Sequence, residues 1–231
     1  MTPPPARPHV GTLREKPLHA ALKRWYFRDG DRFEVPVDGF VIDLVRGDTL
    51  VEIQTTGFSS MARKLGRLLA DHQVRLVHPI PVETRILKVD PEGEVLSRRR
   101  SPRHGTAIDL FAELVSFPEL VDDPNLTIEV VLTREDQVRR HDPDKAWRRK
   151  GWVIEERRLV EVADHVVFRS PDDLMTLVPA DLPDRFTTAD LADHLGCRRR
   201  LAQQMAYCLR RLDLVEMVDK RGNAIVYRRA G

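Results

Sequence analysis

Cysteine is scarce in this sequence. The chain of 231 residues has two cysteines, Cys197 and Cys208, and both lie in one segment with a helical pattern. Eleven residues of helix rise about 16 Å, which is too far for a disulfide between the two thiols. We therefore expect both cysteines to be reduced, and we expect a cytoplasmic protein.

Long apolar runs are also absent from the sequence. No stretch approaches the roughly 20 apolar residues that a membrane helix needs, so we expect no contact with a membrane. The first eleven residues, MTPPPARPHVG, lack the apolar centre of a signal peptide. We interpret residues 1–11 as a flexible lead.

Several familiar catalytic and nucleotide-binding motifs are missing as well. The sequence contains no GxGxxG, no GxxxxGK followed by Ser or Thr, no GxSxG and no HExxH. Nucleotide binding of the Rossmann or P-loop kind, a serine hydrolase triad and a zinc protease site therefore have no support. The eight histidines and two cysteines do not fall at zinc-ligand spacing either.

Charge is abundant but nearly balanced. Charged residues make up 32% of the chain, yet the formal net charge is only +2, and arginine far outnumbers lysine. The planar guanidinium group suits contacts with phosphate, although genome composition or heat adaptation also favours arginine. The composition leaves nucleic-acid contact and these simpler causes both open.

The pattern of expected elements is α/β. Leu18, Leu22 and Trp25 recur at helical spacing and predict a first helix over residues 12–27. Helices are also expected at residues 57–72 and 106–120, and strands at 41–46, 49–55, 73–81, 84–90, 126–133 and 152–168. Residues 91–105 are expected to form a turn and a basic loop, and residues 134–151 a helix plus a loop.

The segment VIDLVRGDTLVEIQT, residues 41–55, predicts a hairpin that carries two acidic residues. Gly47 and Asp48 suit a two-residue turn between strands that are apolar on both faces. This turn places Asp43 opposite Glu52, with Cβ atoms about 5 Å apart. Alternation along the first strand puts Asp43 on the face of Val45. The same turn pairs Arg46 with Thr49 and Val45 with Leu50.

Two carboxylates buried side by side repel each other. A divalent cation would resolve the conflict, and Mg²⁺ accepts one or two protein carboxylates while it binds phosphate oxygens. The alternative is structural: Asp43 pairs with an arginine, and Glu52 lies at a solvated strand end. His19 lies four residues after Glu15 on the same helical face, where it could contact phosphate or simply pack.

An Asp at the end of one strand, followed on the next strand by Glu-Ile-Gln, resembles the core of the PD-(D/E)XK nuclease superfamily. Restriction enzymes and archaeal Holliday-junction resolvases belong to this superfamily. The resemblance covers residues 12–79, and it implies a restriction-endonuclease-like mixed sheet flanked by helices. The whole sequence is also similar to a bacterial family that joins such a core to a C-terminal winged helix.

The resemblance implies roles for specific residues. Asp43 and Glu52 would hold Mg²⁺ or Mn²⁺, and Glu15 in the N-terminal helix would assist them. Gln54 stands where the superfamily has its catalytic lysine, which orients the attacking water and offsets charge. Some branches supply this cation from the following helix, and Lys64 is the candidate here, with Arg63 as its rival.

The C-terminal part of the chain has a different pattern. We expect a nuclease-like α/β domain at 12–170, a Pro-rich linker at 171–185 and a winged helix at 186–231. The second of its two helices opens with three arginines, where a recognition helix approaches DNA. Candidate nucleic-acid contacts are Arg63, Arg148, Arg149, Arg198, Arg199, Arg200, Lys220 and Arg221.

These patterns lead to three hypotheses. The first is a Mg²⁺-dependent nuclease that acts on DNA, with Asp43, Glu52, Glu15, Gln54 and Lys64 at its site. The second is a nucleic-acid-binding or regulatory protein that keeps the nuclease fold but lost the lysine. The third is a homodimer that buries the basic helix start in a subunit interface, since winged helices also mediate protein contacts.

Overall fold

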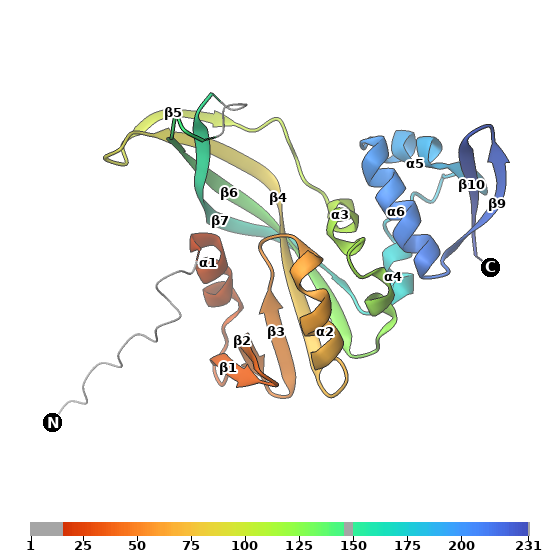
Figure 1. The fold of residues 1–231 in the computed structure, drawn as a ribbon, viewed down its shortest axis with the longest axis horizontal. Helices are drawn as coiled ribbons and strands as arrows, with labels where there is room; N and C mark the ends of the chain where they lie inside the picture. Colours follow the sequence, from red (N-terminus) through yellow and green to blue (C-terminus); the bar gives the residue numbers. More distant parts are fainter. Residues whose placement is uncertain (1–15, 146–149, 231) are drawn as a thin grey trace.

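The computed structural model describes residues 16–145 and 150–230. It has a large mixed sheet flanked by helices and a second, three-stranded sheet near the C-terminus (Figure 1). Glu15, Arg148 and Arg149, three of the candidate site residues, lie outside the described part of the chain.

The N-terminal half of the large sheet is a meander. Helix α1 (Pro17–Tyr26) precedes the antiparallel strands β1 (Arg32–Val37), β2 (Phe40–Arg46) and β3 (Thr49–Ile53). A 3-10 turn η2 (Phe58–Ser60) and helix α2 (Ala62–Leu68) then lead to a strand that is parallel to β3. A crossover helix between parallel neighbours is the expected connection, because the chain must return to the same end of the sheet.

Three long strands make up the other half of the sheet. They are β4 (Gln73–Val89), β6 (Leu126–His141) and β7 (Trp152–Phe168), with the short β5 (Val95–Arg100) paired to the far half of β4. The strand order is β1-β2-β3-β4-β6-β7. β6 is parallel to β4 and antiparallel to β7.

Several expectations about this region were wrong. Residues 134–141 continue β6 and are not a helix, 95–100 are a strand and not a loop, and the two strands expected at 73–81 and 84–90 are one. Pairing with strands on both sides satisfies the β6 backbone. Ion pairs across strands also offset its charges: Asp136 binds Arg85, and Glu135 binds Arg157.

The edge of β4 changes partner halfway along its length. β3 pairs with Gln73–Val77 and β5 pairs with Arg85–Val89. Between them lie Pro79 and Pro81, which have no N–H to donate to a neighbouring strand. The chain after β5 covers part of this gap, since the Gly105 N–H donates to the Pro81 carbonyl at 2.9 Å.

Two apolar cores lie on the large sheet. The larger contains Ile42, Val45, Leu50 and residues of α2, and it continues into the C-terminal helices. The smaller packs α1 against the sheet and includes Leu44 and Val51. The strands of the hairpin are therefore buried on both faces, as their sequence predicts.

The connection from β5 to β6 consists of short helical turns. They are η3 (Ala107–Leu110), α3 (Phe111–Leu114) and η4 (Pro118–Asp122), where one helix was expected over 106–120. The capping box of Thr106 and Asp109 begins η3, and Pro118 begins η4 and separates it from α3.

The C-terminal region has three helices and a three-stranded sheet, and it lies beside α3 (Figure 1). Its elements are α4 (Pro171–Met175), β8 (Arg185–Thr187), α5 (Thr188–Leu195), α6 (Arg199–Arg211), β9 (Val215–Arg221) and β10 (Ala224–Arg229). Thr187 caps α5, and Gly196 ends it in the left-handed region with φ = 58°. The stretch expected to be a linker, 171–185, contains α4 and buries Leu174, Val178 and Leu182 in the larger core.

Membrane crossing by a helix has no support in the structure. Within residues 16–145 and 150–230, every helix is too short or too polar to span a bilayer.

Two glycines lead to a prediction about stability. A Cβ on Gly105 would lie 2.6 Å from Ile80 Cγ2 and 2.7 Å from the Pro81 carbonyl oxygen, so Gly105→Ala will destabilise the protein by about 1–3 kcal/mol. Gly66, in α2, has open space at this position, and Gly66→Ala will stabilise by about 0.5–1 kcal/mol because alanine favours helix. Urea denaturation measures both changes, and equal shifts in the two variants would contradict this account.

Candidate active site

The hairpin register follows the prediction from its turn as far as Leu44, but the predicted pairing of Asp43 with Glu52 is not part of the ladder. Arg46 pairs with Thr49, Val45 with Leu50, and Leu44 with Val51. Beyond Leu44, a side chain replaces the backbone hydrogen bonds between the two strands. Asp43 Oδ2 accepts a hydrogen bond from the Ile53 N–H at 2.9 Å. The Asp43 backbone in turn bonds to the Glu52 carboxylate. The two acids thus lie together where β2 and β3 separate.

The prediction that Asp43 shares the face of Val45 was wrong. Ile42 and Val45 pack in the larger core, whereas Leu44 between them packs in the smaller core. Regular alternation would place Ile42 with Leu44, so β2 turns over at Asp43. Glu34, in the neighbouring β1, has φ = 50°, an unusual backbone conformation for a residue with a side chain.

Asp43 is held from the side of α1. His19 Nε2 lies 3.1 Å from Asp43 Oδ2. Burial acts to raise the pKa of Asp43, but the contacts with His19, the Ile53 N–H and the charge of Lys23 outweigh it. The net effect is a lowered pKa, so Asp43 is ionised at neutral pH.

Glu52 is held from the other side of the sheet, by α2. Lys64 Nζ donates to Glu52 Oε1 at 2.5 Å and to the Val41 carbonyl at 3.0 Å. Burial and the nearby charge of Asp43 raise the pKa of Glu52 to about 7, although Lys64 opposes them. Lys64 therefore contacts Glu52 from the following helix, while Arg63, the other candidate in that helix, is exposed.

Gln54 points toward the loop that follows β3. Its amide nitrogen donates to Thr56 Oγ1 at 3.0 Å and to the Gly57 carbonyl at 2.8 Å. These bonds orient the amide along the loop, so the cation nearest to Glu52 comes from α2 and not from residue 54.

The carboxylates of Asp43 and Glu52 are the oxygen ligands that this site offers to Mg²⁺. Among the described residues, no group of three or more His, Cys, Asp or Glu side chains is placed to hold a metal ion. Two neighbouring carboxylates are nevertheless enough for Mg²⁺, which keeps several waters. Burial first, and then the charge of Asp43, raise the pKa of Glu52, and a cation bound at the two acids would oppose both effects. The two carboxylates are oxygen ligands of the kind that Mg²⁺ takes, and they are contacted from opposite sides of the sheet, Asp43 from α1 and Glu52 from α2.

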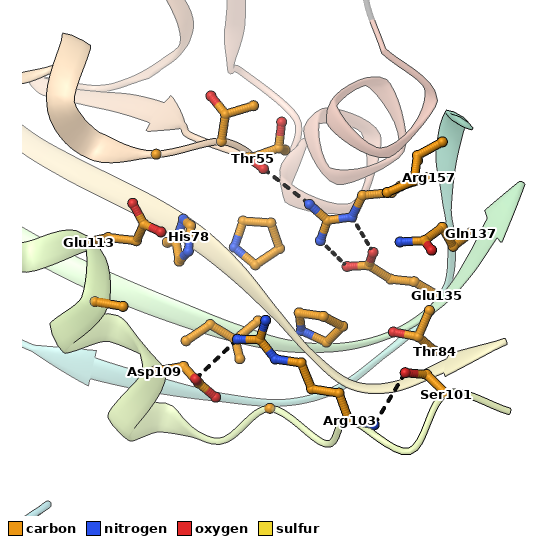
Figure 2. Close-up of a pocket in the computed structure, with 18 of the residues that line it drawn as sticks. Thr55, His78, Thr84, Ser101, Arg103, Asp109, Glu113, Glu135, Gln137 and Arg157 are labelled. Atoms are coloured by element: carbon orange, nitrogen blue, oxygen red, sulfur yellow. Dashed lines mark hydrogen bonds and ion pairs between the residues drawn. The ribbon is translucent and has the colours of Figure 1, made fainter. Parts of the chain in front are cut away.

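A cavity of about 590 Å³ opens at the end of β3 (Figure 2). It lies at the gap between β3 and β5, with His78 and Pro81 of β4 in its wall. Arg157 binds Glu135 through two nitrogens and donates to the Thr55 carbonyl at 3.2 Å. Sequence reasoning missed this cavity, and the two prolines inside a strand were its one local signal.

The basic residues of the C-terminal region lie at the surface. Arg198, Arg199 and Arg200 are exposed at the start of α6. Lys220 and Arg221 are exposed at the end of β9, in the hairpin with β10. They lie on two separate elements, and both groups are open to a charged partner.

Comparison with known proteins identifies the family of this chain. A family described as "Domain of unknown function (DUF8091)" matches residues 16–169. A protein of Treponema pallidum (strain Nichols), described as an uncharacterized protein, is 32% identical over 222 residues, which cover 95% of this chain and 87% of the relative. No solved structure matches the chain. The family match takes in the large sheet and both acids, and the chain therefore belongs to the DUF8091 family.

Proposed function

We propose that the protein is a metal-dependent nuclease that hydrolyses phosphodiester bonds, with DNA as its substrate. The observation that carries the proposal is the meeting of Asp43, Glu52 and Lys64 where β2 and β3 separate. Two acids and one lysine are the groups that the PD-(D/E)XK resemblance implies. Here the lysine comes from α2, which accounts for the glutamine at position 54.

The three side chains would have different roles in phosphodiester hydrolysis. Asp43 and Glu52 would hold Mg²⁺ or Mn²⁺, which when bound lowers the pKa of a coordinated water and offsets phosphate charge. Lys64 lies against Glu52, where its ammonium group can orient a water molecule and stabilise negative charge that develops on the phosphate. His19 fixes the orientation of Asp43.

The order of elements also supports the proposal. A helix, three antiparallel strands, a second helix and a strand parallel to the third follow one another from α1 to β4. The acids fall on the second and third strands and the basic residues on the second helix. This is the placement that the resemblance implies for a restriction-endonuclease-like core.

We further propose that β8, α5, α6, β9 and β10 form a winged helix that binds the substrate. One face of α6 is exposed and polar, with Arg199, Arg200, Gln203, Tyr207 and Arg210 at helical spacing. Arginine and tyrosine suit contacts with phosphate and bases. The opposite face of α6 is buried, which holds the exposed face in a fixed orientation.

A second candidate function is nucleic-acid binding without cleavage. The orientation of Gln54 favours it, because its amide nitrogen bonds to Thr56 and Gly57 and is therefore not available to orient a water molecule at the acids. Lys64 is also ion-paired with Glu52, which is a purely structural use of its charge. The two candidates differ in whether a metal ion leads to cleavage.

The test is cleavage of plasmid, single-stranded and branched DNA, and of RNA, with Mg²⁺, with Mn²⁺ and with EDTA. We expect cleavage only when the metal is present, and we expect it to vanish in Asp43→Asn. Asp48→Asn, in the exposed turn of the same hairpin, is the matched control and should retain activity. Binding that persists without cleavage in either metal would replace the nuclease by the second candidate.

A further inference from the structure

The cavity at the end of β3 has two chemically different ends. Figure 2 shows Glu113 and His78 at one end and Arg157, Glu135 and Gln137 at the other. Arg103 extends along the cavity toward Asp109, with which it forms an ion pair at 3.3 Å (Figure 2). A ligand in this space would meet mainly acceptors at one end and mainly donors at the other.

The donor end is held in place by its own contacts. Arg157 uses three of its five N–H groups on Glu135 and on the Thr55 carbonyl, which leaves two for a ligand. Gln137 accepts hydrogen bonds from Arg139 with its oxygen, at 2.6 and 2.8 Å, so its NH₂ group faces outward as a donor. Such fixed donors suit an anionic group.

The acceptor end is defined by a buried histidine. His78 Nδ1 lies 2.7 Å from the Gln54 carbonyl oxygen, which can only accept, so Nδ1 carries the hydrogen. Burial lowers the pKa of His78 and keeps the ring neutral. Nε2 is then an acceptor beside Glu113, whose Oε2 is bonded to the Phe58 N–H and whose other oxygen stays open. Both groups suit a ligand that donates, such as an amino group.

Between the two ends, the wall is apolar. Pro79, Ile80 and Pro81 of β4 supply one side, and Ile154 of β7 also lines the cavity. Ligand sites have volumes of roughly 300–1,000 Å³ and combine apolar walls with a few convergent polar groups. A volume of about 590 Å³ is ample for a planar heterocycle joined to a sugar and a phosphate.

We propose that this cavity binds a nucleotide, with its phosphate at Arg103, Arg157 and Gln137 and its base against the proline wall. An exocyclic amino group of the base donates to Glu113 and to His78 Nε2. The nucleotide comes either from free mononucleotides or from an unpaired position in a strand. Binding rests on the geometry of the cavity, and it is independent of whether the acids at Asp43 and Glu52 cleave.

The test is isothermal titration calorimetry in EDTA, so that cleavage does not interfere. The ligands are the four common mononucleotides, their nucleosides, a short single strand and a fully paired duplex. We expect micromolar to millimolar binding, tightest for amino-bearing bases, and about tenfold weaker binding in Arg103→Glu and in Gln137→Leu. Arg98→Glu, an exposed arginine of β5 outside the cavity, is the matched control and should bind as the wild type does.

Comparing the mononucleotides with the single strand distinguishes the two sources of the nucleotide. Binding of mononucleotides identifies the free ligand, and binding of the single strand alone identifies an unpaired position in a polymer. The proposal is overturned if neither binds at about 1 mM, the weak end of ordinary affinity. It is also overturned if Arg98→Glu weakens binding as much as the two cavity variants do.

Discussion

Replacing Lys64 with methionine will lower the rate of metal-dependent cleavage by about a hundredfold to a thousandfold, the usual loss when one electrostatic stabiliser is removed from an active site. Lys64 Nζ lies 2.5 Å from Glu52 Oε1, whereas the basic groups that act on Asp43 are His19 and Lys23 of α1. Methionine keeps most of the length of the side chain but removes the charge. Single-turnover cleavage at saturating Mg²⁺ measures the loss.

A second substitution tests whether a lysine at position 54 can replace the lysine at position 64. Residue 54 follows Glu52 by two places, so its side chain starts on the same face of the chain. Gln54→Lys, added to the Lys64→Met protein, is expected to restore about tenfold of the lost rate. Arg67→Met, at another exposed arginine of α2, is the control and should leave the rate unchanged.

The opposite result would have a clear meaning. If Lys64→Met cleaves as fast as the wild type, the lysine only neutralises Glu52 and the cation of the site must come from elsewhere. Thermal unfolding of each variant at the assay pH separates lost chemistry from lost structure, since removal of one partner of a buried ion pair destabilises a protein.

The central hairpin could be predicted because its register depends on residues that are close together in the sequence. The two-residue turn fixed the register from Arg46–Thr49 to Leu44–Val51, and the spacing from Glu52 to Lys64 placed the lysine on the following helix. The turn-over of β2 at Asp43 could not be predicted, since regular alternation along the strand is the only local rule and β2 departs from it there.

Non-local contacts explain the larger errors. The tail of β6 is polar, and what makes a strand favourable there lies outside the segment: pairing with β4 and β7, and the ion pairs with Arg85 and Arg157. The cavity brings together residues from Thr55 to Arg157, which share no periodic pattern. Patterns within short stretches of the sequence cannot predict that segments so far apart lie side by side.

The two acids should respond to pH with opposite signs. The pKa of Glu52 is raised from 4.5 to about 7, so the folded state binds its proton more tightly than the unfolded state. Its contribution to stability is complete below pH 4.5 and is lost as the pH rises through 7. The pKa of Asp43 is lowered, so its contribution is present above the unfolded value of 3.8 and is lost as the pH falls through the folded value.

Glu52→Gln will therefore stabilise the metal-free protein at pH 8 by about 1–3 kcal/mol, because the amide cannot ionise in the buried site. The same change will abolish metal-dependent cleavage, as expected for a residue whose strained charge serves function. Asp43→Asn abolishes cleavage too, but it should destabilise at pH 8, since it removes an ionised group held by His19 and the Ile53 N–H. Urea denaturation in EDTA from pH 5 to 9 measures both.

This pair of variants separates a catalytic site from a structural ion pair. If Glu52 exists to bind Lys64, its replacement by glutamine must destabilise the protein at pH 8, because a buried lysine loses its counter-charge. If Glu52 instead exists to bind a metal ion, the metal-free wild type buries an ionised carboxylate that also repels Asp43, and glutamine removes both costs. Added Mg²⁺ should then stabilise only the wild type, by linkage, and more strongly as the pH rises through 7 and Glu52 becomes ionised. The sign of one stability change at pH 8 thus decides between the two uses of the same carboxylate.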